Sequence, residues 1–80
     1  MKHRSISERL ARAASIDVKR EIARDWAANW RADHDTTILA AGRALAAGDL
    51  DETGRRLGQL KALHDKAFVG LQAVLEDLGR

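Results

Sequence analysis

The sequence predicts an all-α protein, and three observations carry that prediction. Apolar residues recur every three or four positions along nearly the whole chain of 80 residues, which is the spacing of amphipathic helices. The chain has no proline and no tyrosine, and its three aromatic residues are too few for a β-sandwich or barrel. We therefore expect one helical domain over residues 1–80, an antiparallel helical hairpin preceded by a short N-terminal helix and assembled as a homodimeric four-helix bundle.

The first predicted element is a short amphipathic helix over residues 6–14. Ser5 precedes it, and Glu8 follows Ser5 by three residues, so together they form a capping box. The helix either folds over the end of the bundle or continues into the next helix.

The second predicted element is a long helix over residues 17–47. Its apolar stripe has steps of four and three residues and consists of Val18, Ile22, Trp26, Trp30, His34, Ile38, Ala41 and Leu45. Residues 33–37 are rich in side chains that prefer helix caps. We favour one continuous, bent helix, and the alternative is a break that leaves separate helices over 17–32 and 36–47.

The third predicted element is a helix over residues 50–78. Gly48 ends the preceding helix, and Asp49 caps this one with Glu52 three residues later. A heptad repeat with two apolar positions runs along it. The first position holds Leu50, Leu57, His64, Leu71 and Leu78, and the second holds Thr53, Leu60, Ala67 and Val74.

A turn at residues 48–49 also predicts which residues of the two long helices lie opposite each other. In an antiparallel pair with so short a connection, opposed residue numbers sum to about 97. Trp26 is then expected opposite Leu71, His34 opposite His64 and Ala41 opposite Leu57.

Two helices cannot enclose a core, so a second copy of the chain is the expected partner. A single core of this size rarely supplies more than about 3–5 kcal/mol, and without cysteine no disulfide can help. Glycine inside a helix costs about 1 kcal/mol relative to alanine. Glycines at four positions within the predicted helices therefore suggest close packing against another backbone: Gly42, Gly54, Gly58 and Gly70.

The composition also limits the compartment and the partners. No apolar run approaches the roughly 18 residues of a membrane span, and no secretory signal is evident near the N-terminus. We expect a cytoplasmic protein without a membrane partner. The net charge of +2 combines a net +4 over residues 1–31 with a net −2 over residues 32–80.

His34 and His64 are the candidate metal ligands. Each lies on an apolar stripe, each is followed by an aspartate, and the predicted register places them side by side. A two-fold dimer would hold four such histidines, and imidazole binds transition metals such as zinc. The alternative is a pair of neutral core histidines bonded to each other or to a nearby polar group.

The basic N-terminal third offers a second alternative, which is nucleic-acid binding. Its candidate residues are Arg9, Arg12, Arg20 and Arg24. Acidic residues are interleaved with them, however, and no recognition-helix pattern accompanies them, so a solvated helix surface is favoured.

No catalytic motif is present, and we expect no enzyme. The chain has no serine–histidine–acid spacing, no phosphate-binding glycine loop and no metal-hydrolase motif. Trp26 and Trp30, four residues apart on the apolar stripe, are interpreted as core packing. The favoured function is a small non-enzymatic interaction or regulatory module that acts as a homodimer and binds a protein partner.

Overall fold

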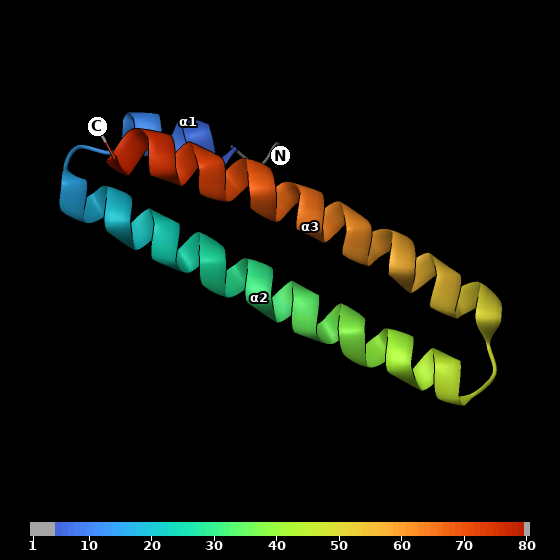
Figure 1. Ribbon diagram of the computed structural model, residues 1–80. Coiled ribbons are helices and arrows are strands. Elements are labelled where there is room, and N and C mark those ends of the chain that lie inside the picture. The colour runs from blue at the N-terminus through green and yellow to red at the C-terminus, as the bar shows by residue number, and fades with distance from the viewer. Residues whose placement is uncertain (1–4, 80) are drawn as a thin grey trace.

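The computed structural model describes residues 5–79, and its regular elements in that range are three α-helices (Figure 1). They are α1 (Ile6–Arg12), α2 (Ile16–Ala46) and α3 (Leu50–Leu78). Residues 5–79 contain no strand. The prediction of an all-α fold is therefore confirmed.

The short helix α1 begins as the sequence indicates but ends earlier. The Ser5 hydroxyl accepts a hydrogen bond of 3.2 Å from the backbone N–H of Glu8. The expected end at residue 14 is wrong, because Ala13 is already extended, with φ −70° and ψ 137°. Ser15 is extended too, and its hydroxyl accepts a 3.2 Å bond from the N–H of Val18. Ser15 caps α2 in an extended conformation, so residues 13–15 cannot continue α1.

The long helix α2 is continuous through the segment where a break was the alternative. The hydroxyl of Thr37 donates a 2.8 Å hydrogen bond to the carbonyl oxygen of Asp33, one turn earlier. Its polar group is thereby satisfied within the helix, and the backbone ladder needs no interruption. A helix of 31 residues results.

The turn between α2 and α3 reverses the chain in three residues. Gly48 has a φ of 74°, a conformation that glycine adopts at little cost. The N–H of Asp49 donates to the carbonyl of Ala44 at 2.9 Å, and the Asp49 carboxylate accepts from the N–H of Glu52 at 3.1 Å. As a result α2 and α3 lie side by side and run in opposite directions (Figure 1).

The register between these two helices follows the predicted pairing. Lys19 forms an ion pair of 2.8 Å with Asp77, and the rings of His34 and His64 have centroids 5.5 Å apart. The indole of Trp26 lies against Gly70. The residue numbers of all three pairs sum to within one of the predicted 97.

The rotation of α3 about its own axis differs in part from the prediction. The second heptad position, with Leu60, Ala67 and Val74, is half-buried as expected, but most of the first is exposed. Leu57 and Leu71 were expected to face α2, but they are 66% and 56% exposed. Gly70 is buried, and Leu63 is half-buried. The physical reason lies at Gly70, because a position without a side chain gives room for the Trp26 indole, and leucine there would not.

The four glycines inside the helices differ in how closely other atoms approach them. A Cβ added to Gly70 would overlap the Trp26 indole, as close packing requires. Gly42, Gly54 and Gly58 have no atoms within 4 Å of such a Cβ. Within a single copy, close packing is therefore present at Gly70 and at none of these three glycines.

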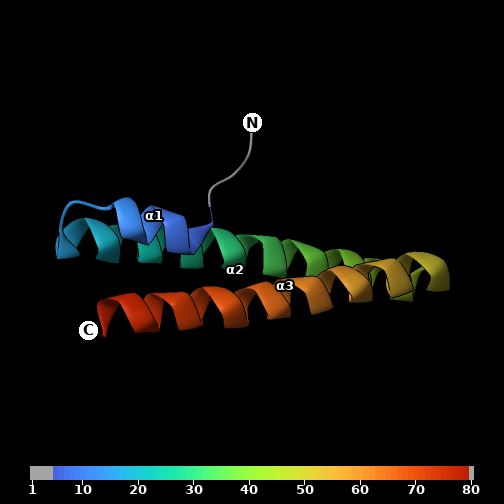
Figure 2. The same ribbon diagram turned by 90° about the horizontal axis from the view of Figure 1, so that it is seen from above.

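The core of the single chain is thin. The helix α1 packs across α2 and α3 on one side (Figure 2). Among the described residues, the buried apolar side chains are Ile6, Leu10 and Ala44, and Leu10 is the most deeply buried at 1% exposure. Within residues 5–79, no helix combines the length and the apolar character that crossing a membrane would require.

Candidate functional site

One side of the α2–α3 pair carries large apolar side chains that nothing in the described chain covers. Leu50, Leu57, His64 and Leu71 are seven residues apart and therefore line one side of α3, joined by Phe68 and Leu75. On α2, Ile38 and Leu45 share a side with His34. We call this surface the open face, and its seven large apolar side chains are 48–72% exposed: Ile38, Leu45, Leu50, Leu57, Phe68, Leu71 and Leu75.

The open face lies opposite α1. Ala73 follows His64 by nine residues, which is half a turn around the helix axis. Ala73 lines a hollow together with Leu10 of α1. The side of α3 that carries His64 therefore points away from α1, and Figure 2 shows α1 on the far side of the helix pair in the view of Figure 1.

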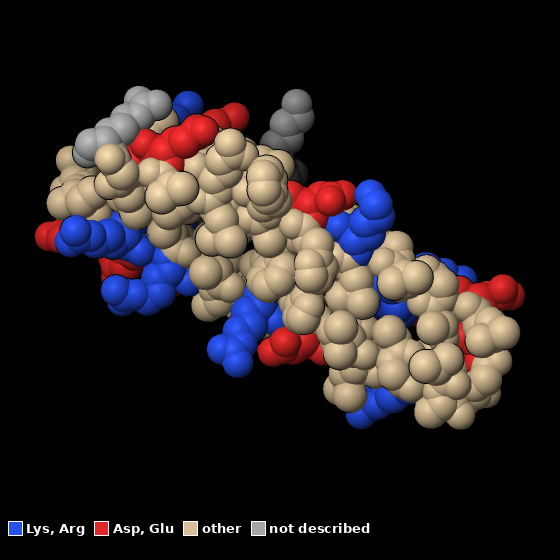
Figure 3. Space-filling view, in the orientation of Figure 1, with Lys and Arg blue, Asp and Glu red and all other residues tan. Residues whose placement is uncertain are grey.

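Charged residues border the open face rather than cross it. Figure 3 views the molecule from the side away from α1, and uncharged residues form a band along its length with basic and acidic groups mainly at the edges. A large exposed apolar patch with a polar rim is typical of an interaction surface.

Three rings gather halfway along this face, and two of them are the predicted candidates. The imidazoles of His34 and His64 meet edge to face at 5.5 Å between centroids. The indole of Trp30 stacks on His34 at 5.0 Å and meets the edge of His64 at 6.0 Å. The structure therefore brings together the two histidines that the sequence singles out, which we call the histidine pair.

Each histidine keeps access to solvent, and the imidazole of His34 lies beside a carboxylate. The side chain of His34 is 26% exposed, and its Nδ1 lies 3.3 Å from a carboxylate oxygen of Asp35. The Arg31 guanidinium approaches the other oxygen of that carboxylate at 3.7 Å. His64 is exposed. In a single copy, neither histidine is therefore buried, and burial of the pair in a dimer stays a prediction.

Trp30 has a role in addition to the predicted core packing. Its indole N–H donates a 2.6 Å hydrogen bond to the carbonyl oxygen of Leu63 on α3. This bond ties the two helices together one residue away from His64. No sequence pattern marks it, because a backbone carbonyl is present at every position of a helix.

A single copy offers two ligands at this place. Among residues 5–79, no group of three or more histidine, cysteine, aspartate or glutamate side chains could hold a metal ion. Zinc in proteins takes four ligands in structural sites. Two imidazoles from one chain are thus half of such a set.

The candidate nucleic-acid residues occupy two helices. Arg9 and Arg12 lie in the last turn of α1, and Arg9 lines a hollow that also includes Trp26. Arg20 on α2 lies 3.8 Å from the carboxylate of Asp17, and both side chains are largely exposed. Arg24 lies one turn further along α2 and is exposed. Nucleic-acid binding by these residues stays a prediction.

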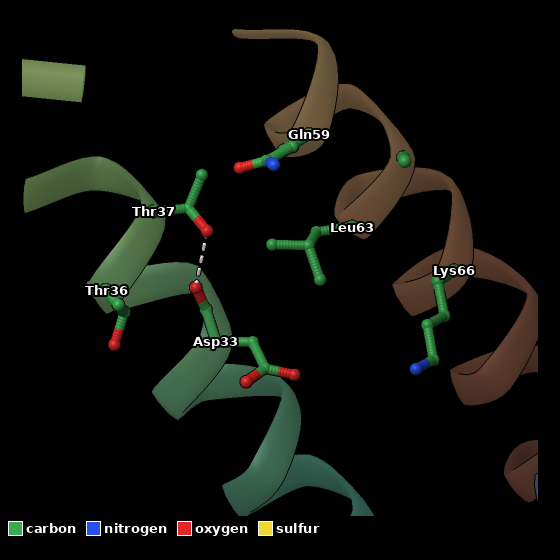
Figure 4. A pocket seen from close by; sticks show the side chains of 7 residues that line it. Asp33, Thr36, Thr37, Gln59, Leu63 and Lys66 are labelled. Carbon is green, nitrogen blue, oxygen red and sulfur yellow. Dashed lines mark hydrogen bonds between the residues drawn. The ribbon is translucent and has the colours of Figure 1, made fainter. Parts of the chain in front are cut away.

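A further hollow lies between α2 and α3, with a volume of about 410 Å³. Leu63 points between the helices, and Thr37 uses its hydroxyl in the bond to the Asp33 carbonyl (Figure 4). Asp33 and Lys66 are the charged residues that line it. Its lining residues include no histidine, and its one carboxylate and one ammonium group form no recognised catalytic set.

No protein-family model matches the chain, and neither does any curated protein or solved structure. Two features of the molecule itself bear on its function. These are the open face and the histidine pair at its middle.

Proposed function

We propose that this chain is a small non-enzymatic interaction module that acts as a homodimer through its open face. The observation that carries the proposal is the amount of surface that one copy leaves exposed. The chain has a mass of 8.8 kDa and an accessible surface of 6245 Å². A folded monomer of that mass is expected to expose roughly 4,800 Å².

The excess of roughly 1,400 Å² is more than a standard interface needs from one partner, which is about 800 Å². It belongs to an elongated molecule, with a radius of gyration of 15.6 Å where about 12 Å is typical of this length. The large apolar side chains of the open face contribute to this exposed surface, and a partner on that face would cover them.

A second copy of the chain would match the open face in shape and polarity. The face is formed by two antiparallel helices, and a pair of such helices packed on an identical pair makes a four-helix bundle. A two-fold axis through the face would bring its large apolar side chains against the same side chains of the partner. Each side chain that becomes fully buried contributes about 1.5–3 kcal/mol.

The test compares two leucine substitutions on the surface of the chain. Leu57 lies on the open face and is 66% exposed, whereas Leu39 is 55% exposed and follows His34 by five residues. Leu39 therefore lies about 140° around α2 from the histidine, outside the open face. Leu57→Lys should weaken self-association, and Leu39→Lys is the matched control.

The mass of each protein in solution would be measured by light scattering over a range of concentrations. We expect a dimer for the original chain and for Leu39→Lys. Removing two buried leucines per dimer should raise the dissociation constant of Leu57→Lys by about 10²–10⁴-fold. A folded monomer of the original chain, with its helices confirmed by circular dichroism, would refute the proposal.

A further inference from the structure

We propose that the histidine pairs of two copies together bind one transition-metal ion, with zinc as the probe. The inference rests on the proposed homodimer, because one copy supplies only His34 and His64. It assigns a chemical role to the two polar groups in the middle of an otherwise apolar face.

The spacing of the two rings suits a shared metal ion. With zinc–nitrogen bonds of about 2.0–2.1 Å and a tetrahedral angle, two coordinated imidazoles have ring centroids roughly 5.2 Å apart. The centroids of His34 and His64 are 5.5 Å apart. The centroid separation is therefore compatible with a shared metal ion, and both side chains would rotate out of their edge-to-face contact so that one nitrogen of each ring points to the ion.

The surroundings of His34 favour a ligand role for one of its nitrogens. Metal-binding histidines commonly donate the N–H of the other ring nitrogen to a carboxylate, which fixes the tautomer and the orientation of the ring. The Asp35 carboxylate lies 3.3 Å from Nδ1 of His34. If Nδ1 carries the proton, Nε2 has the free lone pair. The stacked Trp30 ring limits the rotation of His34 further.

The position of His64 favours a site shared between copies. His64 lies at the centre of α3, fourteen residues from both Leu50 and Leu78. If two identical faces overlap along their full length, the two-fold axis passes near this residue. The histidine pairs of both copies then meet, and four imidazoles complete a tetrahedral zinc site.

The cost of burying His64 in a dimer also favours a metal ion at this place. Covering the open face would remove His64 from water, and a buried polar group without a hydrogen-bond partner costs about 1–3 kcal/mol. A metal ion would occupy the ring nitrogens, which the apolar side chains of the open face cannot satisfy.

The experiment is native mass spectrometry of the untagged full chain after dialysis against zinc, since a purification tag would add histidines. We expect a dimer with one zinc ion. His34→Gln and His64→Gln should each remain helical and lose the zinc. His3→Gln, which removes the third histidine of the chain, is the matched control and should retain it.

The possible outcomes separate this inference from the proposed dimer. A metal-free dimer would overturn the metal site and leave the homodimer standing, whereas a metal-free monomer would overturn both. A monomer that carries zinc would also overturn the shared site, as would a His64→Gln dimer that keeps its zinc. Intense visible absorption of the cobalt(II)-loaded dimer, lost in His64→Gln, would support a tetrahedral site.

Discussion

The contact between Gly70 and Trp26 gives the sharpest prediction for stability. Gly70→Ala places a Cβ about 2.5 Å from Cη2 and 2.8 Å from Cε2 of the indole. Carbon atoms in good contact are about 3.5–4.0 Å apart, and Cζ2 of the indole would lie closer still than Cη2, so the ring or the helix has to move by more than about 1 Å. Both belong to the interface between α2 and α3, and such overpacking costs about 1–3 kcal/mol.

A second effect of the same substitution has the opposite sign. Alanine inside a helix is more favourable than glycine by about 1 kcal/mol. The net change in the free energy of unfolding for Gly70→Ala should therefore lie between about zero and 2 kcal/mol of destabilisation.

Gly58→Ala separates the two contributions. Gly58 also lies inside α3, and a Cβ there meets nothing within 4 Å. It precedes His64 by six residues, about 120° around the helix, so it also lies away from the centre of the open face. Gly58→Ala should gain the helix preference alone and stabilise the protein by about 1 kcal/mol.

The measurement is unfolding in urea followed by circular dichroism, at one fixed protein concentration because the stability of a dimer depends on concentration. The difference between the two variants isolates the overpacking cost, about 1–3 kcal/mol. Equal stabilisation of Gly70→Ala and Gly58→Ala would refute the close approach of Trp26 to α3.

Two further substitutions test the connections between α2 and α3. Gly48→Ala should destabilise the protein by about 1 kcal/mol, because the φ of 74° is unfavourable for alanine although no atom lies within 4 Å. An unchanged urea midpoint would contradict the left-handed turn. Trp30→Phe should cost about 1 kcal/mol because it removes the 2.6 Å bond to the Leu63 carbonyl. Unchanged stability would show that this bond contributes nothing.

The parts of the fold that depend on local chemistry could be predicted from the sequence. Ser5, Ser15 and Asp49 all act as helix caps, because a side-chain oxygen near the first turn needs no distant partner. The register between α2 and α3 also follows from a local feature, the turn at Gly48. Because that turn fixes the register, the contact between His34 and His64 could be expected from the order of the residues alone.

The rotation of α3 could not be predicted in the same way. A heptad repeat marks an apolar stripe on a helix but does not say which surface covers it. The stripe through Leu57 and Leu71 was assigned to α2, whereas the side of α3 with Leu63 and Gly70 contacts α2 instead. Which side of α3 faces α2 depends on how the Trp26 and Trp30 indoles fit between the helices, which is a tertiary property.

The size of the apolar side chains explains why the chain uses α3 in this way. The contact between α2 and α3 holds two indoles against small or half-buried positions such as Gly70, and this combination lets the helices approach closely. The larger side chains of α3, including Leu57 and Phe68, are left on the other side. If these larger side chains lay between α2 and α3, no space would remain for the indoles. The packing of the indoles between the two helices therefore leaves the larger side chains on the open face. The histidine pair lies where these two surfaces of α3 meet, because Trp30 contacts both rings and Leu63.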